Sequence, residues 1–309
     1  MSGSVRASHE QLAEAAHEDV LARAELASLG WDRDAVARQV NQGRWALHGS
    51  RTVALHCGPL APGALQWRAV WESGASAALD GVSAMQAAGM TGFVEQHIHV
   101  SIDHRARFHP VSGVVAHRVR RRVKDEVLTN GVPRVRPAVA AVRAARWAVS
   151  DRQAALILVL PVQQRLVTPA QLVLAADQVK GRSRRALVAM LVQDIASGAH
   201  SLGELDFAVL CRRRGLPEPT RQVLRRGPRG RIYLDVEWED IGLVVEIDGS
   251  QHFAGLAPTD DALRSNAVVL GRRMVLRMTL LGLRLAPEEF MDQVCEAHRQ
   301  RTDGRRLAG

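Results

Sequence analysis

Residues 231–249, RIYLDVEWEDIGLVVEIDG, have the pattern of a β-hairpin and organise the last third of the chain. Apolar and polar residues alternate over 232–237, as in a strand that is buried on one face only. Residues 243–247 are almost continuously apolar and β-branched, which is typical of a central strand. Residues 239–242 form the predicted turn, so the two strands are expected to pair antiparallel.

The predicted hairpin brings two carboxylates together. If the turn takes the four residues between Trp238 and Leu243, these two pair, and counting outward puts Asp235 across from Glu246. Opposed side chains have Cβ atoms about 5 Å apart, and like charges in that position destabilise a sheet. A divalent cation compensates, because Mg²⁺ takes one or two carboxylates together with water and phosphate oxygens. Asp248 shares the face of Glu246, since side chains alternate along a strand.

Two other arrangements fit the same residues. A one-residue slip of the register would undo the pairing of the two carboxylates. Alternatively, Asp235 and Glu246 would point to solvent on an edge hairpin, although the apolar run around Glu246 argues against an edge position.

The other elements of the last third indicate an α/β domain with a small mixed sheet. Helices are expected from about Ser201, from about Thr259 and from Pro287, with a strand at 274–279. Between the first helix and the hairpin lies a basic loop that would hold a phosphate backbone. Its cations are Arg212, Arg213 and Arg214.

Asp235, the run Glu246-x-Asp248-Gly249 and His252 resemble the PD-(D/E)XK nuclease superfamily. More narrowly, they resemble the actinobacterial domain of unknown function that is related to very-short-patch-repair endonucleases. The same resemblance covers about the last hundred residues, through Ser201-Leu-Gly-Glu204, Gly215-Leu-Pro217, Asp261, Arg264 and Arg273-Met-Val-Leu-Arg277. It implies a restriction-endonuclease-like mixed sheet flanked by helices and a metal-dependent nuclease activity.

The resemblance also implies roles for the acidic residues. Asp235, Glu246 and Glu204 would bind Mg²⁺ or Mn²⁺, and Asp248 or His252 would orient or deprotonate the attacking water. Gly249 lets the chain turn at the strand end, which is expected to bring His252 over the carboxylates as a charged donor.

One residue departs from the superfamily pattern. Position 248 is Asp where the superfamily usually has lysine, and the chain has no lysine beyond Lys180. Positive charge at the scissile phosphate would have to come from an arginine, from His252 or from the metal. A domain with this fold that does not cleave is therefore an alternative.

The first 65 residues have the layout of a winged helix. A helix is expected over 9–29, Asp32 is a good N-cap for a second helix over 33–42, and two short strands follow at 44–47 and 52–55. The second helix is the expected DNA-contacting helix, because its side chains can bond phosphates and base edges. These residues are Arg33, Arg38, Gln39, Gln42 and Arg44. The alternative is a small helical cap that binds nothing.

The middle of the chain predicts an α+β domain. An Ala-rich helix is expected over 66–90, a strand over 97–102, and four helices over 136–149, 151–163, 168–178 and 182–198. Residues 114–123 are expected as a strand with Arg118, Arg120 and Arg122 on one face. That face is either a phosphate track or a charged sheet edge. His97 and His99 are expected to face water, with metal binding as the weaker alternative.

The front of the chain is similar to abortive-infection (AbiEi-type) type IV antitoxin-like proteins, whose winged-helix and middle regions often precede this nuclease domain. The matching pieces are Gln42-Gly43-Arg44-Trp45 and Leu79-Asp80-Gly81-Val-Ser83-Ala84. The resemblance implies a DNA-binding repressor, with a homodimer and a toxin-like protein as further partners.

Composition agrees with a nucleic-acid partner. The 309 residues carry a formal net charge of +9, nearly all of it from arginine, which suits a polyanionic partner. No run of about 18 apolar residues occurs, so neither a transmembrane helix nor a membrane partner is expected. The polar N-terminus has no signal-peptide pattern, so a cytoplasmic location is expected. Cys57, Cys211 and Cys295 lack metal-binding spacing and are expected as small buried residues.

Together these patterns predict an α/β multi-domain protein with a winged helix over 1–65, an α+β domain over 66–199 and a nuclease domain over 200–309. The predicted function is metal-dependent hydrolysis of phosphodiester bonds in DNA. The alternatives are an antitoxin-like transcriptional repressor with an inactive nuclease fold and an RNA-directed nuclease.

Overall fold

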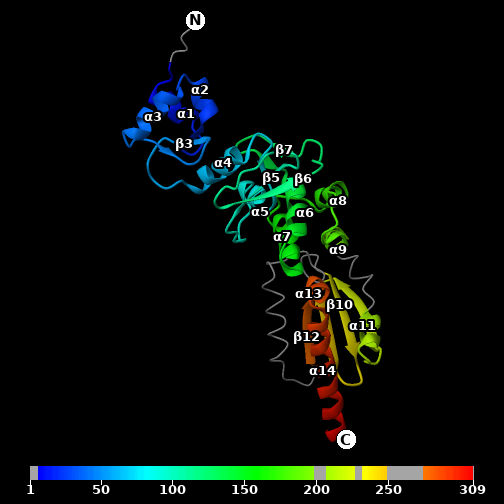
Figure 1. Ribbon diagram of the computed structural model, residues 1–309. Coiled ribbons are helices and arrows are strands. Elements are labelled where there is room, and N and C mark those ends of the chain that lie inside the picture. The colour runs from blue at the N-terminus through cyan, green and yellow to red at the C-terminus, as the bar shows by residue number, and fades with distance from the viewer. Residues whose placement is uncertain (1–5, 198–206, 227–231, 249–273, 309) are drawn as a thin grey trace. The chain divides into compact units, whose positions relative to one another are not determined.

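The computed structural model describes residues 6–197, 207–226, 232–248 and 274–308, and it is an α/β protein with three separate sheets in these residues (Figure 1). The chain divides into two compact units. The first comprises residues 1–144 and 178–180, and the second comprises 145–177 and 181–309. The three predicted domain boundaries stay predictions. None of the described helices is both long enough and apolar enough to cross a membrane.

The first unit begins with three short helices and an antiparallel sheet. The helices are α1 (His9–Ala15), α2 (Arg23–Ser28) and α3 (Arg33–Asn41). The strands are β1 (Val20–Ala22), β2 (Ala46–Leu47) and β3 (Thr52–Ala54), in the order β1-β3-β2. Asp32 caps α3 by accepting a hydrogen bond from the Ala35 backbone N–H at 2.7 Å, so the predicted start of this helix is confirmed.

The single helix predicted over 9–29 is wrong. The chain leaves α1 after Ala15 and turns at Glu18 and Asp19, which both have positive φ. Val20 and Leu21 then form β1 and are almost completely buried. Pairing with β3 and burial in the sheet outweigh the local helical pattern here.

The helix α4 (Pro62–Ser73) holds the turn between β2 and β3. The Glu72 carboxylate accepts hydrogen bonds from Ser50 N–H and Oγ, from Arg51 N–H and from Thr52 Oγ1, at 2.8–3.0 Å. Burial alone would raise the pKa of Glu72, but these hydrogen bonds outweigh it and lower the pKa. The turn is therefore fixed to α4 by a charged acceptor.

A five-stranded mixed sheet follows, in the order β6-β5-β4-β8-β7. Its strands are β4 (Ala78–Leu79), β5 (Ile98–Asp103), β6 (Val114–Val119), β7 (Val127–Leu128) and β8 (Arg134–Val135). The helix predicted over 66–90 is wrong, because α4 ends at Ser73 and α5 (Gly81–Ala87) starts only after β4. Gly74, at φ 108°, ends α4, and the Asp80 side chain caps α5.

A buried ionic cluster joins this sheet to α6 (Pro137–Trp147). The Arg143 guanidinium donates to Asp80 Oδ2 and to Glu126 Oε2, both at 2.8 Å, and Arg122 donates to Glu126 Oε1 at 2.9 Å. Asp80, Glu126 and Arg143 are each at most 4% exposed, so their charges compensate one another away from water. Burial raises the pKa of Asp80 despite the neighbouring Arg143.

The second unit contains α7 (Asp151–Gln163) and α9 (Arg185–Ser197). The helix α8 (Pro169–Gln178) ends at the residue where the chain returns briefly to the first unit. With α6, these are the four helices predicted over 136–198, and the prediction is confirmed.

The C-terminal part has a four-stranded mixed sheet in the order β12-β11-β10-β9. Its strands are β9 (Arg221–Arg226), β10 (Ile232–Trp238), β11 (Leu243–Asp248) and β12 (Met274–Thr279). The helices are α11 (Phe207–Arg213), α13 (Leu280–Leu285) and α14 (Pro287–Ala308), and α14 runs along the sheet (Figure 1). Phe207, Trp238 and Phe290 share one apolar core between these helices and the sheet.

The predicted hairpin, the strand at 274–279 and the helix from Pro287 are confirmed. The strand β9 was not predicted. The helices expected from Ser201 and Thr259 fall mainly on residues outside the described part. All three cysteines are free, but only Cys211 is buried, whereas Cys57 is exposed.

Candidate functional site

The register of the hairpin places the two predicted carboxylates opposite each other. Trp238 pairs with Leu243, and Asp235 pairs with Glu246, so the predicted register is confirmed. β10 and β11 are the two central strands of the sheet, which rules out the edge hairpin. The carboxylate pair therefore lies at the middle of the sheet, where each strand has neighbours on both sides.

The two faces of the hairpin differ sharply in chemistry. Leu234, Val236 and Trp238 of β10 and Leu243, Val245 and Ile247 of β11 are at most 2% exposed in the core. Because side chains alternate, Asp235, Glu246 and Asp248 lie on the opposite face. Asp235 is 9% exposed, while the Glu246 side chain is 33% exposed. One carboxylate is thus buried, and its partner is reachable from solvent.

A third charged residue completes the row. β11 and β12 are parallel, and Arg277 is the register partner of Glu246. Its Nε donates to Glu246 Oε2 at 3.1 Å, and its side chain is 74% exposed. Asp235, Glu246 and Arg277 therefore follow one another across three strands. Arg277 belongs to the motif named in the resemblance, but its place beside Glu246 depends on a parallel register that the local sequence does not reveal.

The described residues contain two of the three predicted metal ligands. Asp235 and Glu246 fit a hard divalent cation, because carboxylate oxygens are its preferred ligands and the opposed charges need compensation. Glu204 and His252 lie outside the described residues, as do Asp261 and Arg264. No group of three or more His, Cys, Asp or Glu side chains arranged to hold a metal is found among the described residues.

Two of the three arginines predicted to hold phosphate have carboxylate partners. Arg212 donates to Glu218, and Arg214 donates to Glu288 and Asp292. Arg212 and Arg213 are the last residues of α11 rather than part of a loop. A phosphate at Arg212 or Arg214 would have to replace these carboxylates.

The α3 surface presents most of the predicted nucleic-acid contacts to solvent. Arg33, Arg38, Gln42 and Arg44 are exposed, whereas Val36 faces the core as predicted. Gln39 is only partly exposed, and its side-chain oxygen is buried without a hydrogen-bond partner. The exposed arginines and Gln42 are thus better placed than Gln39 to reach a ligand.

The strand predicted over 114–123 is too long, while phosphate binding by its arginines stays a prediction. β6 ends at Val119, so Arg120 and Arg122 follow the strand instead of continuing its face. Arg122 turns into the buried ionic cluster, and Arg118 donates to the backbone carbonyls of His104 and Ala106 at 2.8 and 3.0 Å. Among these three arginines, only Arg120 remains exposed without such an internal bond.

A pair of histidines occupies neighbouring parallel strands of the middle sheet. His99 Nδ1 and His117 Nε2 lie 2.9 Å apart, and their rings stack. Glu95 Oε2 is 3.6 Å from His99 Nε2. Burial, and then the nearby His99, lower the pKa of His117 to about 3, and burial also lowers the pKa of His99 despite Glu95. The expectation that His99 faces water is wrong.

Because of this histidine pair, we expect the folded protein to lose stability in acid. Because its folded-state pKa is depressed, His117 binds a proton more readily in the unfolded chain, so stability falls between pH 6.5 and about 3. The slope approaches about 1.4 kcal/mol per pH unit for one such group. We expect His117→Gln to flatten this dependence in urea unfolding measured from pH 7 to pH 4. The exposed His97, changed to Gln, is the control, and equal slopes for both variants and the wild type would contradict the assignment.

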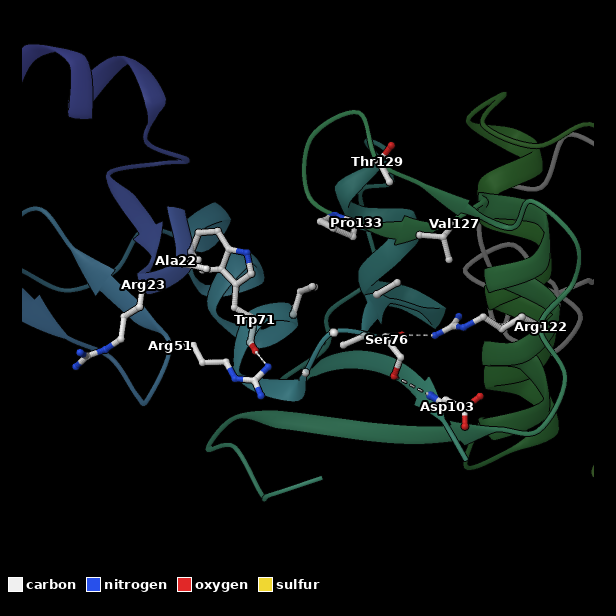
Figure 2. Close-up of a pocket in the computed structure, with 16 residues that line it drawn as sticks. Ala22, Arg23, Arg51, Trp71, Ser76, Asp103, Arg122, Val127, Thr129 and Pro133 are labelled. Carbon is white, nitrogen blue, oxygen red and sulfur yellow. Dashed lines mark hydrogen bonds between the residues drawn. The ribbon is translucent and has the colours of Figure 1, made fainter. Parts of the chain in front are cut away.

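A cavity of about 940 Å³ lies in the first unit, and Figure 2 shows its lining. Its polar groups bond mainly to one another. Arg122 donates to the Ser76 carbonyl, Ser76 Oγ accepts from the Asp103 backbone N–H, and Arg51 donates to the Trp71 carbonyl. None of the described residues predicted as catalytic lines it. The cavity and the carboxylate row are therefore formed by different residues.

Neither a protein-family model nor a curated protein matches the chain. Among solved structures, the Rv2827c protein from Mycobacterium tuberculosis is similar with a TM-score of 0.38 and 17% sequence identity. That comparison covers 63% of this chain and 84% of that chain. A TM-score this low does not define a shared fold or a shared function.

Proposed function

We propose that this chain binds DNA through an N-terminal winged helix and hydrolyses its phosphodiester bonds with a metal-dependent, restriction-endonuclease-like C-terminal domain. The observation that carries the proposal is the pairing of Asp235 with Glu246 at the centre of the C-terminal sheet. Like charges in that position oppose sheet formation. A bound cation would compensate the two charges, and binding that cation would be the function of the pair. The basic composition and the exposed arginines of α3 support a polyanionic substrate.

Each residue of the row has a role in this proposal. Asp235 and Glu246 would hold Mg²⁺ or Mn²⁺ from adjacent strands, with Glu204 as the third ligand predicted from the sequence. The ion, when bound, polarises a phosphoryl oxygen and lowers the pKa of a bound water. Asp248, two residues beyond Glu246 on the same face, accepts the proton of the attacking water. Arg277 donates from its exposed guanidinium to the scissile phosphate.

The bonds and protons balance in this hydrolysis. The water oxygen bonds to phosphorus while the bond between phosphorus and the leaving ester oxygen breaks. The leaving oxygen takes up a proton, and His252 is the donor that we propose for it. No lysine is needed, because Arg277 supplies the positive charge next to Glu246.

A second candidate function is that of an antitoxin-like repressor whose nuclease fold is inactive. Such a repressor would form a homodimer and bind a toxin-like protein. The observation that favours it is the bond between Arg277 and Glu246, because the guanidinium already compensates one of the two carboxylates. Under this hypothesis the row is a structural ion pair and needs no metal.

Incubation of the purified chain with supercoiled plasmid separates the two functions. Nicked or linear products in Mg²⁺ or Mn²⁺, and none in EDTA, are expected of the nuclease. Intact plasmid at micromolar protein in either metal, with retained duplex binding, would support the repressor. A matched incubation with single-stranded RNA tests the RNA-directed alternative.

The proposed DNA contact of α3 predicts a specific binding defect. We expect Arg38→Ala combined with Gln42→Ala to weaken duplex binding, because Arg38 is exposed on the helix and Gln42 is exposed at its C-terminal end. Loss of one phosphate contact by Arg38 should lower the slope of log affinity against log salt by about 1. A gel-shift titration over a range of salt measures both quantities.

Arg182→Ala is the matched control for this double variant, since it removes one charge from another exposed arginine. Affinity and salt slope equal to those of the control would place DNA binding outside α3.

A further inference from the structure

Two segments of the chain follow the C-terminal ends of neighbouring strands in the middle sheet. β5 and β6 are parallel neighbours, so residues 104–109 after β5 and residues 120–125 after β6 start side by side. The His104 backbone N–H donates to the Val119 carbonyl at 3.2 Å. Arg118 donates to the carbonyls of His104 and Ala106. The backbone of the first segment is therefore tied to the strand from which the second emerges.

Positive charge is concentrated in these two segments and in the stretch of chain that connects them. Residues 103–125 contain seven arginines and lysines and two aspartates, a net charge of +5, which is more than half of the chain's total of +9. Two of these cations, Arg118 and Arg122, are used internally. The other five are all exposed. They are Arg105, Arg107, Arg120, Arg121 and Lys124.

The exposed cations lack neutralising partners within the described part of the chain. None of the five forms an ion pair with a described carboxylate, and Asp103, the nearest acid in the sequence to Arg105, contacts His104 and accepts from the Arg105 backbone N–H. Unpaired guanidinium groups on tethered segments have free donors in a fork that matches phosphate oxygens. Two segments that start side by side thus offer several exposed cations for phosphate oxygens.

We propose that this basic edge, defined as Arg105, Arg107, Arg120, Arg121 and Lys124, binds the phosphate backbone of duplex DNA. This inference rests on the proposed DNA partner, but it concerns a different surface from that of α3. Contacts of this kind position a protein on DNA without reading bases. The exposed large hydrophobic residues of the described chain all lie outside 103–125, which favours a polyanion over insertion into a membrane surface.

The test uses the full-length chain and two double variants, Arg105→Ala with Arg107→Ala and Arg120→Ala with Arg121→Ala. Each removes two exposed positive charges from one segment. The control, Arg182→Ala with Arg185→Ala, removes two exposed charges elsewhere. Binding to duplexes of two unrelated sequences is measured by gel shift across a salt series. All variants are first compared by circular dichroism and melting temperature.

We expect each basic-edge variant to lower the salt slope by about 2 and to weaken binding equally for both duplexes, since each phosphate contact contributes about 0.9 to the slope. The control should match the wild type. Wild-type slopes in both basic-edge variants, with a defect in the α3 variant, would overturn the basic edge and leave the DNA partner intact.

Failure of the wild type to bind either duplex at low salt would overturn the DNA partner itself. In that case phosphatidylserine vesicles provide a second readout. Vesicle binding that both basic-edge variants lose would reassign the same cations to an anionic membrane surface.

Discussion

We expect Asp235→Ala and Glu246→Ala each to reduce DNA cleavage at least about a hundredfold, equivalent to about 2.7 kcal/mol of barrier. Each change removes one of two opposed carboxylates that the register places on adjacent central strands. Without one partner, the remaining carboxylate cannot hold the cation that the reaction requires. Plasmid cleavage in Mg²⁺ and in Mn²⁺ measures the loss.

Melting temperature gives a second readout that does not depend on activity. In the wild type the metal should raise the melting temperature, because a ligand that binds only the folded chain stabilises it. Both variants should lose this shift. In the absence of metal, either variant can melt at or above the wild-type temperature, since the repulsion between the carboxylates is relieved.

Glu239→Gln is the matched control for both readouts. Glu239 is an exposed acid in the turn of the same hairpin and lies beyond the paired residues of β10 and β11. It should cleave and respond to metal as the wild type does. Retention of both cleavage and the metal-induced shift in Asp235→Ala or Glu246→Ala would reject the carboxylate pair as the site.

The parts of the fold that the sequence predicts well depend on local interactions. The Asp32 cap bonds a backbone N–H only three residues away, so the start of α3 was predictable. The pairing of Trp238 with Leu243 follows from a four-residue turn, and it fixes Asp235 opposite Glu246. Within such short spans, the pattern of the residues determines the structure almost alone.

The parts that the sequence misses depend on distant partners. β1 is held by β3, about 30 residues away, so Val20 and Leu21 look locally like a continued helix. β9 has the polar sequence Arg-Gln-Val-Leu-Arg-Arg and becomes a strand through its pairing with β10. Tertiary pairing of this kind overrides local propensity.

The residues of the candidate site also fall into two groups, those predictable from the local sequence and those whose place depends on distant partners. Its carboxylates share one hairpin, whereas Arg277 reaches Glu246 only because β12 pairs parallel to β11 across 31 residues. Arg122 was predicted on an exposed strand face, but a bond to Glu126 takes it into the buried cluster. Side chains whose partners come from other elements cannot be assigned before the topology is known.

Substitution of Arg277 distinguishes the nuclease hypothesis from the hypothesis that Arg277 and Glu246 form only a structural ion pair. If its guanidinium contacts the scissile phosphate, Arg277→Ala should lose about a hundredfold in cleavage, near 2.7 kcal/mol of barrier. Arg277→Lys should recover about tenfold of that loss, since an ammonium keeps the charge but not the planar fork. Melting temperature in the absence of metal should change little, because the side chain is 74% exposed.

The expected effect of Arg277→Ala on metal affinity is opposite in sign to its expected effect on cleavage. In the wild type the Arg277 guanidinium donates to Glu246 Oε2, so it competes with a cation for that oxygen. Arg277→Ala should therefore raise the affinity for Mg²⁺ or Mn²⁺, seen as a larger metal-induced melting shift, while cleavage falls. Arg299→Ala, which removes another exposed arginine beside a glutamate, should change neither quantity. Cleavage by Arg277→Ala at the wild-type rate would exclude Arg277 from the reaction and leave the sequence-based candidates Arg264 and His252 to be tested next.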